Sequence, residues 1–244
     1  MKIILTGATG YIGTELLTAC LSNPRITSII ALTRRDLLSS NPHLTNPKLR
    51  VLKITESDFL SYSDPALTDE IRGASACLWT IGITPAKLKE LNEEEKRVIS
   101  LDYLAAASKA FTELSSTDAK AGKKFRFIFI SGIAAERDQE RALWYWNDFW
   151  KLRGESENIL LRHAASHSDA FEAYIMRPGL VPSAAGAVRD LLWGLVPSVR
   201  LDFLVNAMIS LALRGNEKRI WENGEIKGFG QGQGEEEGKW EEGQ

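Results

Sequence analysis

The chain has 244 residues, of which 44% are hydrophobic and 25% are charged, and its formal net charge is −2. No stretch approaches the roughly 18 consecutive apolar residues that cross a membrane, and no signal peptide follows Lys2. No basic stripe or zinc-ligand spacing indicates a nucleic-acid partner. We therefore expect a globular cytoplasmic protein with no membrane partner, no nucleic-acid partner and no metal.

The first thirteen residues, MKIILTGATGYIG, have the pattern of a dinucleotide-binding turn. The apolar run Ile3–Leu5 predicts a strand buried in a parallel sheet, and the amphipathic stretch Tyr11–Leu21 predicts a helix. Between them, Gly7 allows a sharp turn, Gly10 a close approach of a pyrophosphate, and Gly13 close packing of the helix. The helix N-terminus favours phosphate. We expect cofactor contacts from Gly7, Thr9, Gly10, Tyr11, Ile12 and Gly13, the alternative being a tight turn with no ligand.

The G-x-x-G-x-x-G spacing resembles that of the short-chain dehydrogenase/reductase superfamily. The residues GATGYIG are similar to those of its extended and atypical branches, which are NAD(P)-binding, epimerase-like proteins. This resemblance implies a Rossmann-type fold with a bound nicotinamide dinucleotide.

The end of the second predicted strand, Thr27–Leu32, bears on the choice of cofactor. Thr33 follows about 20 residues after Gly13, where dinucleotide-binding folds read the adenosine ribose. Arg34 and Arg35 then offer planar donors suited to a 2′-phosphate, which favours NADP(H). The alternative is NAD, with Asp36 binding the ribose.

Two further stretches complete the expected cofactor cleft. A third strand, Leu49–Ile54, precedes Asp58, which by resemblance contacts the adenine, although a helix cap explains it equally well. The fourth strand, Ala76–Thr80, opens into a turn in which Thr80 and Gly82 are expected to border the nicotinamide ribose.

The rest of the chain continues the alternation of helices and strands. A helical stretch over Leu91–Leu114 precedes strands at Phe125–Ile130 and Ala173–Gly179. Two helical segments and a short strand, Arg219–Trp221, follow. The fold class is therefore α/β, a doubly wound parallel sheet in one domain over 1–221. Its dinucleotide-binding core is 1–180, and 181–221 forms one wall of the cleft. Residues 222–244 carry a net charge of −5 and predict a disordered, Gly-rich acidic tail.

The resemblance also implies a catalytic Ser at the end of the fifth strand and a Tyr-x-x-x-Lys motif on the next helix. Ser131 matches the first, and the segment 144–157 resembles Y-x-x-x-K-G-E-x-E. Phe149 and Arg153, however, occupy the Tyr and Lys positions. Phe149 has no proton to transfer, whereas Arg153 keeps its charge and can hold a ribose hydroxyl or a phosphate. Tyr145, one turn before Phe149, is the substitute acid, with aromatic packing as its alternative.

The remaining candidates have structural interpretations. His163 and His167 are spaced i,i+4 but lack a third ligand, so we interpret them as surface residues. Cys20 and Cys77 are interpreted as small core residues.

The motifs together resemble the TIP30-like group of atypical oxidoreductases, and this resemblance implies NADPH binding. Two functions stay open. One is an NADP(H)-dependent reductase of a small carbonyl compound with an altered proton donor. The other is a catalytically silent, redox-responsive NADP(H)-binding module with a protein partner.

Overall fold

A computed structural model of the chain describes residues 1–37, 43–84, 87–119, 123–144, 146–182 and 197–241. Within these residues, parallel strands form a single seven-stranded sheet in the order β3-β2-β1-β4-β5-β6-β7. The strands are β1 (Lys2–Thr6), β2 (Ser28–Thr33), β3 (Leu49–Lys53), β4 (Ala76–Trp79), β5 (Phe125–Ile130), β6 (Phe171–Arg177) and β7 (Ile220–Glu222).

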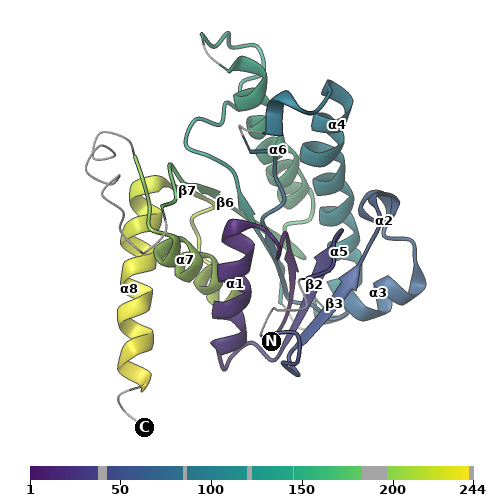
Figure 1. Cartoon of the computed structure of the whole chain (residues 1–244), viewed down its shortest axis with the longest axis vertical. Coiled ribbons are helices and arrows are strands. Elements are labelled where there is room, and N and C mark those ends of the chain that lie inside the picture. The colour runs from purple at the N-terminus through teal and green to yellow at the C-terminus, as the bar shows by residue number, and fades with distance from the viewer. Residues whose placement is uncertain (38–42, 85–86, 120–122, 145, 183–196, 242–244) are drawn as a thin grey trace.

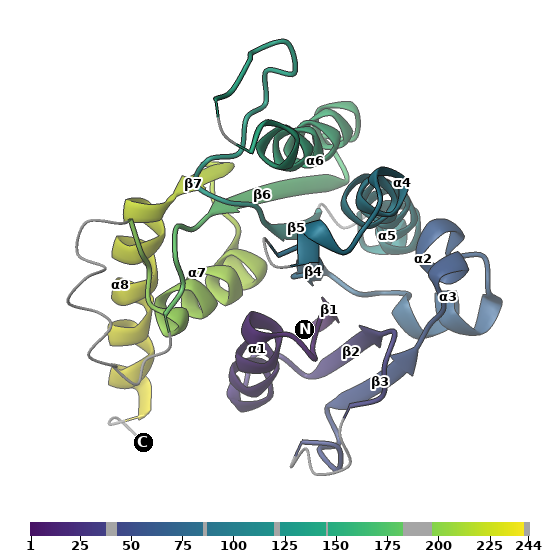
Figure 2. The ribbon, with the colours of Figure 1, turned by 45° about the horizontal axis from the view of Figure 1, so that its top comes forward.

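Helices cover both faces of this sheet (Figures 1 and 2). One face carries α1 (Tyr11–Ser22) and α7 (Leu201–Arg214), with α8 (Asn223–Glu241) packed outside α7. The other carries α2 (Glu56–Ser61), α3 (Pro65–Ile71), α4 (Glu93–Arg97), α5 (Tyr103–Ala119) and α6 (Asn147–Ser166). The arrangement is the expected doubly wound α/β fold.

The core is divided by the sheet into two apolar clusters, because successive side chains of a strand point to opposite faces. In β1, Ile3 and Leu5 pack in the cluster beneath α1 and α7, whereas Ile4 packs in the cluster beneath α5 and α6. The second cluster is rich in aromatic rings. Trp79 and Phe127, for example, lie on the neighbouring strands β4 and β5 with their ring centroids 5.6 Å apart.

The long helix expected over Leu91–Leu114 is confirmed, and it begins at Glu93 after an Asn92 cap. It contains a π-helical turn over Val98–Asp102, between α4 and α5, which begins at Tyr103. The flanking residues Arg97, Val98 and Tyr103 are all right-handed helical, so the backbone continues as a helix through this turn. Periodicity alone did not reveal the π-helical turn because it changes the hydrogen-bond pattern and not the run of apolar residues.

The C-terminal segment also differs from the expectation of a disordered tail. Residues 223–241 form α8, and Ile226 is fully buried in the cluster that contains α7. Phe229 packs against Trp221, with 4.7 Å between ring centroids. The few apolar residues of this segment therefore fall on one helical face, which a count of Gly and Glu did not detect. No described helix has the length and apolarity needed to cross a membrane.

Candidate functional site

The glycine turn lies between β1 and α1. At β1 the strand order changes direction, because β2 and β3 lie on one side of β1 and β4 to β7 lie on the other. Gly7 has a φ of +73°, which side chains rarely adopt, and a Cβ there would lie 2.3 Å from the Thr80 Oγ1. A Cβ on Gly13 would lie 2.0 Å from the Gly7 carbonyl oxygen. The turn therefore needs two of its glycines for its own close packing, and it leaves a backbone cradle at the N-terminus of α1, where phosphate binds favourably.

The exit of β4 is fixed to this turn. The Thr80 hydroxyl donates to the Thr6 carbonyl at 2.7 Å, and the Thr80 backbone N–H donates to the Thr6 hydroxyl at 3.3 Å. Gly82 follows in the loop that lines a small cavity beside β5 and α6. The structure thus brings the glycine turn, Thr80 and Gly82 to one edge of the sheet, as the sequence predicts.

The residues at the end of β2 are those expected to determine whether NADP(H) or NAD binds. The Thr33 hydroxyl is buried and has no hydrogen-bond partner among the described residues. Arg34 pairs with Glu56 at 3.3 Å, and both side chains are largely exposed. The carboxylate of Asp36 instead accepts from Lys53 at 2.7 Å, which lowers its pKa.

Asp58 caps the N-terminus of α2, which is one of the two roles that the sequence left open for it. It is the third residue of α2, and its carboxylate accepts from the Thr55 backbone N–H and hydroxyl, both at 2.7 Å. The Thr55 hydroxyl in turn accepts from the Asp58 backbone N–H, which completes a capping box. The helix-cap interpretation of Asp58 is therefore confirmed.

Ser131, at the end of β5, is part of a buried ionic network. Its hydroxyl donates to Glu157 of α6 at 2.6 Å, and Glu157 is fully buried. Arg177 of β6 donates to both Glu157 oxygens, at 2.9 and 2.5 Å, and also to Glu222 at 3.0 Å. These bonds to Glu157 raise the pKa of Arg177. Because a serine hydroxyl has one hydrogen, Ser131 in this arrangement can accept but not donate toward the cleft.

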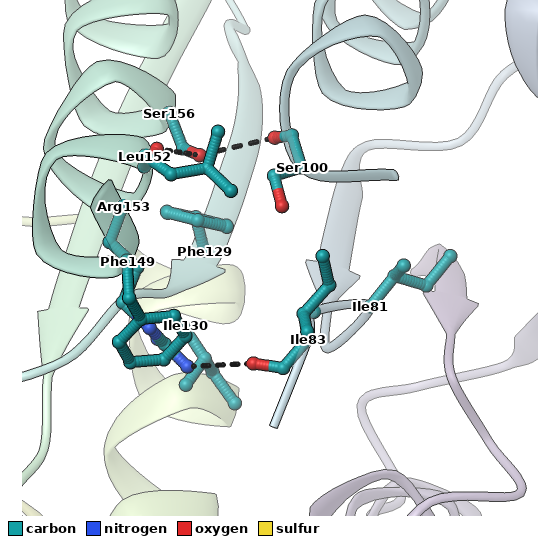
Figure 3. Close-up of a pocket in the computed structure, with 10 residues that line it drawn as sticks. Ile81, Ile83, Ser100, Phe129, Ile130, Phe149, Leu152, Arg153 and Ser156 are labelled. Atoms are coloured by element: carbon teal, nitrogen blue, oxygen red, sulfur yellow. Dashed lines mark hydrogen bonds between the residues drawn. The ribbon is translucent and has the colours of Figure 1, made fainter. Parts of the chain in front are cut away.

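Phe149 and Arg153 lie one turn apart on α6 and face the loop that follows β4 (Figure 3). Phe149 is buried, and the Arg153 guanidinium lies over its ring at 4.8 Å from the centroid. Arg153 donates to the carbonyl oxygens of Ser131 and Ile83. Burial lowers the pKa of Arg153 to about 10, so the group still carries its charge at neutral pH, as the sequence predicts.

The space beside these two side chains is small. The cavity lined by Phe149, Arg153, Ile83 and neighbouring apolar residues has a volume of about 20 Å³. A water needs roughly 10–15 Å³ of such volume, so this cavity has room for about one water.

Tyr145, the substitute acid, lies outside the described residues. The interpretation that placed it one helical turn before Phe149 required a helix from residue 144, but α6 begins at Asn147 after Trp146 in a left-handed conformation, with φ +51°. The helix that carries Phe149 therefore begins two residues before it, at Asn147.

The remaining candidates serve the fold. His163 accepts or donates one hydrogen bond with the Thr112 hydroxyl at 2.9 Å and stacks on His167, with 4.2 Å between ring centroids. His163 is half-buried between α5 and β6, so only His167 is the exposed residue that we expected. The described residues contain no cluster of three potential metal ligands. Cys20 and Cys77 are buried and unpaired, as predicted.

Comparison with known proteins supports the same fold. No family model matches the chain. A curated relative, the mitochondrial protein FMP52 of Candida albicans, is 27% identical over 185 residues, which are 73% of this chain and 66% of that protein. The chain therefore spans slightly less than two thirds of that relative.

Solved structures with this fold include two L-threonine dehydrogenases and a protein solved with NAD. L-threonine 3-dehydrogenase from Trypanosoma brucei aligns over 90% of this chain and 74% of its own, with a TM-score of 0.67 and 13% identity. A GalE-like L-threonine dehydrogenase from Cupriavidus necator aligns over 91% and 77%, with a TM-score of 0.64 and 16% identity. MoeE5, solved with UDP-glucose and NAD, aligns over 91% and 75%, with a TM-score of 0.63 and 15% identity. The chain shares the Rossmann-type, doubly wound fold of these structures.

The roles of Glu157 and Arg177 were not foreseen from the sequence. A usable signal was nevertheless present, because Glu157 lies three residues after Gly154 and three before Leu160, on the buried face of α6. A carboxylate on such a face requires a buried cation, and Arg177 on the neighbouring strand supplies it.

Proposed function

We propose that this protein binds NADP(H) at the edge of the sheet where β1 and β4 end. We further propose that it is a catalytically silent, redox-responsive binding module. The glycine cradle, the buried Thr33 hydroxyl and the adjacent arginines fit a dinucleotide. Arg34 is the group placed to bind the 2′-phosphate once it leaves Glu56, and Arg35 is exposed beside it.

Bound NADPH would supply a hydride to the carbonyl carbon of a substrate, and the protein would then have to protonate the carbonyl oxygen. In this family that proton comes from the Tyr of the Tyr-x-x-x-Lys motif, with help from the Ser hydroxyl. Phe149 stands at the Tyr position and carries no proton. Arg153 stands at the Lys position, and its guanidinium is directed at the Ser131 and Ile83 carbonyls.

The observation that carries the proposal is the bond from Ser131 to Glu157. With its hydrogen directed at a buried carboxylate, Ser131 does not stabilise charge on a substrate oxygen, a contribution that reaches about 10²–10³-fold for one donor in other enzymes. The cleft thus lacks both hydrogen donors of the family's reaction while it keeps the cofactor cradle.

A binding titration together with a turnover assay tests the proposal. We expect NADPH to bind more tightly than NADH by calorimetry, and we expect no consumption of NADPH above background with a panel of aldehydes and ketones. Turnover of any panel member would favour the reductase alternative, with a water held by Ser131 or with Tyr145 as the acid. Absence of binding to either dinucleotide would contradict both functions.

The cellular setting remains a proposal. A protein without catalytic activity exerts its function by binding another molecule. We therefore infer a protein partner that binds the NADP⁺-bound and NADPH-bound forms of this protein with different affinities. We also infer a cytoplasmic location and membership of the TIP30-like group, both supported by sequence motifs and composition.

A further inference from the structure

A second and much larger cavity lies between α4 and the first turn of α6, two elements that are neighbours in both views of the fold (Figures 1 and 2). Its volume is about 560 Å³, which falls within the range of small-molecule sites. Its lining residues are Leu88, Glu93, Lys96, Arg97, Trp146, Asn147, Asp148, Phe149 and Leu152.

The apolar part of this cavity is built from two perpendicular aromatic rings. Trp146 and Phe149 have ring centroids 5.6 Å apart and an interplanar angle of 83°. Trp150 stacks on Trp146 from 6.0 Å, which holds the indole in place. The partly exposed indole of Trp146 offers a flat apolar surface for an aromatic ligand, and the buried Phe149 ring supports the indole from one side.

The backbone at Trp146 is strained to place that ring. Its φ is +51°, a left-handed conformation that bulky residues rarely adopt and that costs free energy. Such strain is concentrated at functional sites, and a glycine would occupy this position at lower cost. The backbone conformation does not favour a tryptophan here, so we attribute the presence of Trp146 to its side chain, which lines the cavity.

A cation completes the lining on the α4 side. The Lys96 side chain is only 16% exposed, and its ammonium donates to Glu93, whose side chain is 80% exposed, at 2.6 Å. An ammonium has three donors, and the contacts given by the described residues account for one of them. Arg97 also lines the cavity, but its guanidinium is directed at Glu94 and Asp102. Lys96 is thus the cation able to take an anionic group.

The cavity is separated from the cofactor side by a thin wall. Phe149 and Leu152 line both this cavity and the 20 Å³ cavity beside β4 and β5. The buried Phe149 ring and Leu152 therefore separate a ligand in the larger cavity from the groups at the end of β5. The larger cavity is a site of its own and does not require a bound dinucleotide.

We propose that the α4–α6 cavity binds a planar aromatic molecule that carries a carboxylate or another anionic group. The ring of the ligand lies on Trp146, and the anionic group accepts from Lys96. A charge-assisted hydrogen bond in a partly buried site is among the stronger polar contacts of proteins, so the anionic group should contribute measurably to affinity.

The test uses 2-naphthoate and its uncharged counterpart 2-naphthylmethanol, titrated calorimetrically into the full chain without dinucleotide. We expect 2-naphthoate to bind at least about tenfold more tightly than 2-naphthylmethanol. Lys96→Gln should remove this preference, and Trp146→Gly should weaken both ligands while it relieves the backbone. Lys89→Gln, which removes an exposed charge outside the cavity lining, is the matched control and should change nothing.

Equal binding of the two compounds to the unmodified protein would overturn the proposal, as would no binding at millimolar concentration. Retention of the full preference in Lys96→Gln would also overturn it. If Trp146→Gly fails to fold, the comparison of the two compounds on the unmodified and Lys96→Gln proteins decides the question alone. Because no dinucleotide is present, these outcomes are independent of whether the protein binds NADPH.

Discussion

The Ser131 hydroxyl donates its hydrogen to Glu157 across 2.6 Å, and Glu157 is itself held by two nitrogens of Arg177. This places Ser131, the serine that follows β5, inside a buried ionic network that joins β5, α6 and β6. The network serves the packing of these elements, and it withdraws the serine proton from the cleft.

The first prediction concerns the stability of this network. Glu157→Gln leaves Arg177 without its buried anion, and removal of one partner from a buried pair typically costs about 3–5 kcal/mol. Urea unfolding should show this loss in the free energy of unfolding. Glu155→Gln on the same helix is the control, because Glu155 pairs with the exposed Arg162 and should cost at most about 1 kcal/mol. Equal effects of the two variants would show that the network is not buried in solution.

The second prediction concerns the preference for NADPH. Arg34→Ala should reduce it by about five- to tenfold, less than a buried contact would give, because Arg34 is 45% exposed on its side chain and already paired with Glu56. Glu56→Gln frees Arg34 and should increase the preference modestly. Calorimetric titration with both dinucleotides measures the ratio. An Arg34→Ala protein with an unchanged ratio would exclude Arg34 as the 2′-phosphate ligand.

The third prediction separates the cofactor role of the glycine turn from its structural role. Gly10 has a φ of −89°, which any residue adopts, and a Cβ there would lie 3.2 Å from the Gly7 carbonyl oxygen. Gly10→Val should therefore abolish binding of both dinucleotides while the protein stays folded by circular dichroism. Gly13→Val should unfold the protein, because its Cβ would lie 2.0 Å from the same oxygen. Dinucleotide binding that survives Gly10→Val would mean that the turn is not the phosphate site.

The fourth prediction concerns Phe149 and Arg153. The double change Phe149→Tyr with Arg153→Lys introduces a phenol and an ammonium where the family has them, and a placed general acid contributes about 10²–10⁴-fold. We expect NADPH-dependent reduction to rise at least about tenfold above background but to stay below that range, because Ser131 still donates to Glu157. A spectrophotometric assay at 340 nm follows the reaction, with Phe149→Leu as the control. A variant that binds NADPH but gains no activity would show that the cleft excludes carbonyl substrates.

The fifth prediction tests whether α8 packs on α7. A Cβ on Gly230 would lie 1.9 Å from the Phe203 carbonyl oxygen, whereas a Cβ on Gly228 meets nothing within 4 Å. Gly230→Ala should lower the free energy of unfolding, while Gly228→Ala should raise it by up to about 1 kcal/mol through helix propensity. Thermal unfolding of both variants gives the comparison. Identical melting temperatures would restore the interpretation of this segment as a disordered tail.

The structure also brings a pH dependence through His163. Burial, followed by the proximity of His167, lowers the pKa of His163 in the folded protein below its ordinary value of 6.5. The unfolded chain then binds the proton at higher pH, so the free energy of unfolding should fall as pH drops below about 6.5 and level off below the folded pKa. Urea unfolding between pH 7.5 and 5.5 measures this dependence, and His163→Gln should flatten the curve.

The sequence by itself determined the fold class, the position of each strand to within about two residues and the glycine cradle. These features depend on local signals, such as apolar runs and glycines at fixed spacing, that are complete within a few consecutive residues. The sequence also showed that Phe149 carries no phenol, since that is a property of the residue and not of its surroundings.

Only the tertiary structure decided what surrounds these residues. Ser131, Glu157 and Arg177 come from three different elements, so their network depends on the register of β5 against β6 and on the rotation of α6. The α4–α6 cavity likewise depends on the helix beginning at Asn147 rather than at residue 144 and on the left-handed backbone at Trp146. Hydrogen bonds and cavities join residues far apart in the chain, and their geometry is fixed only when the layers pack.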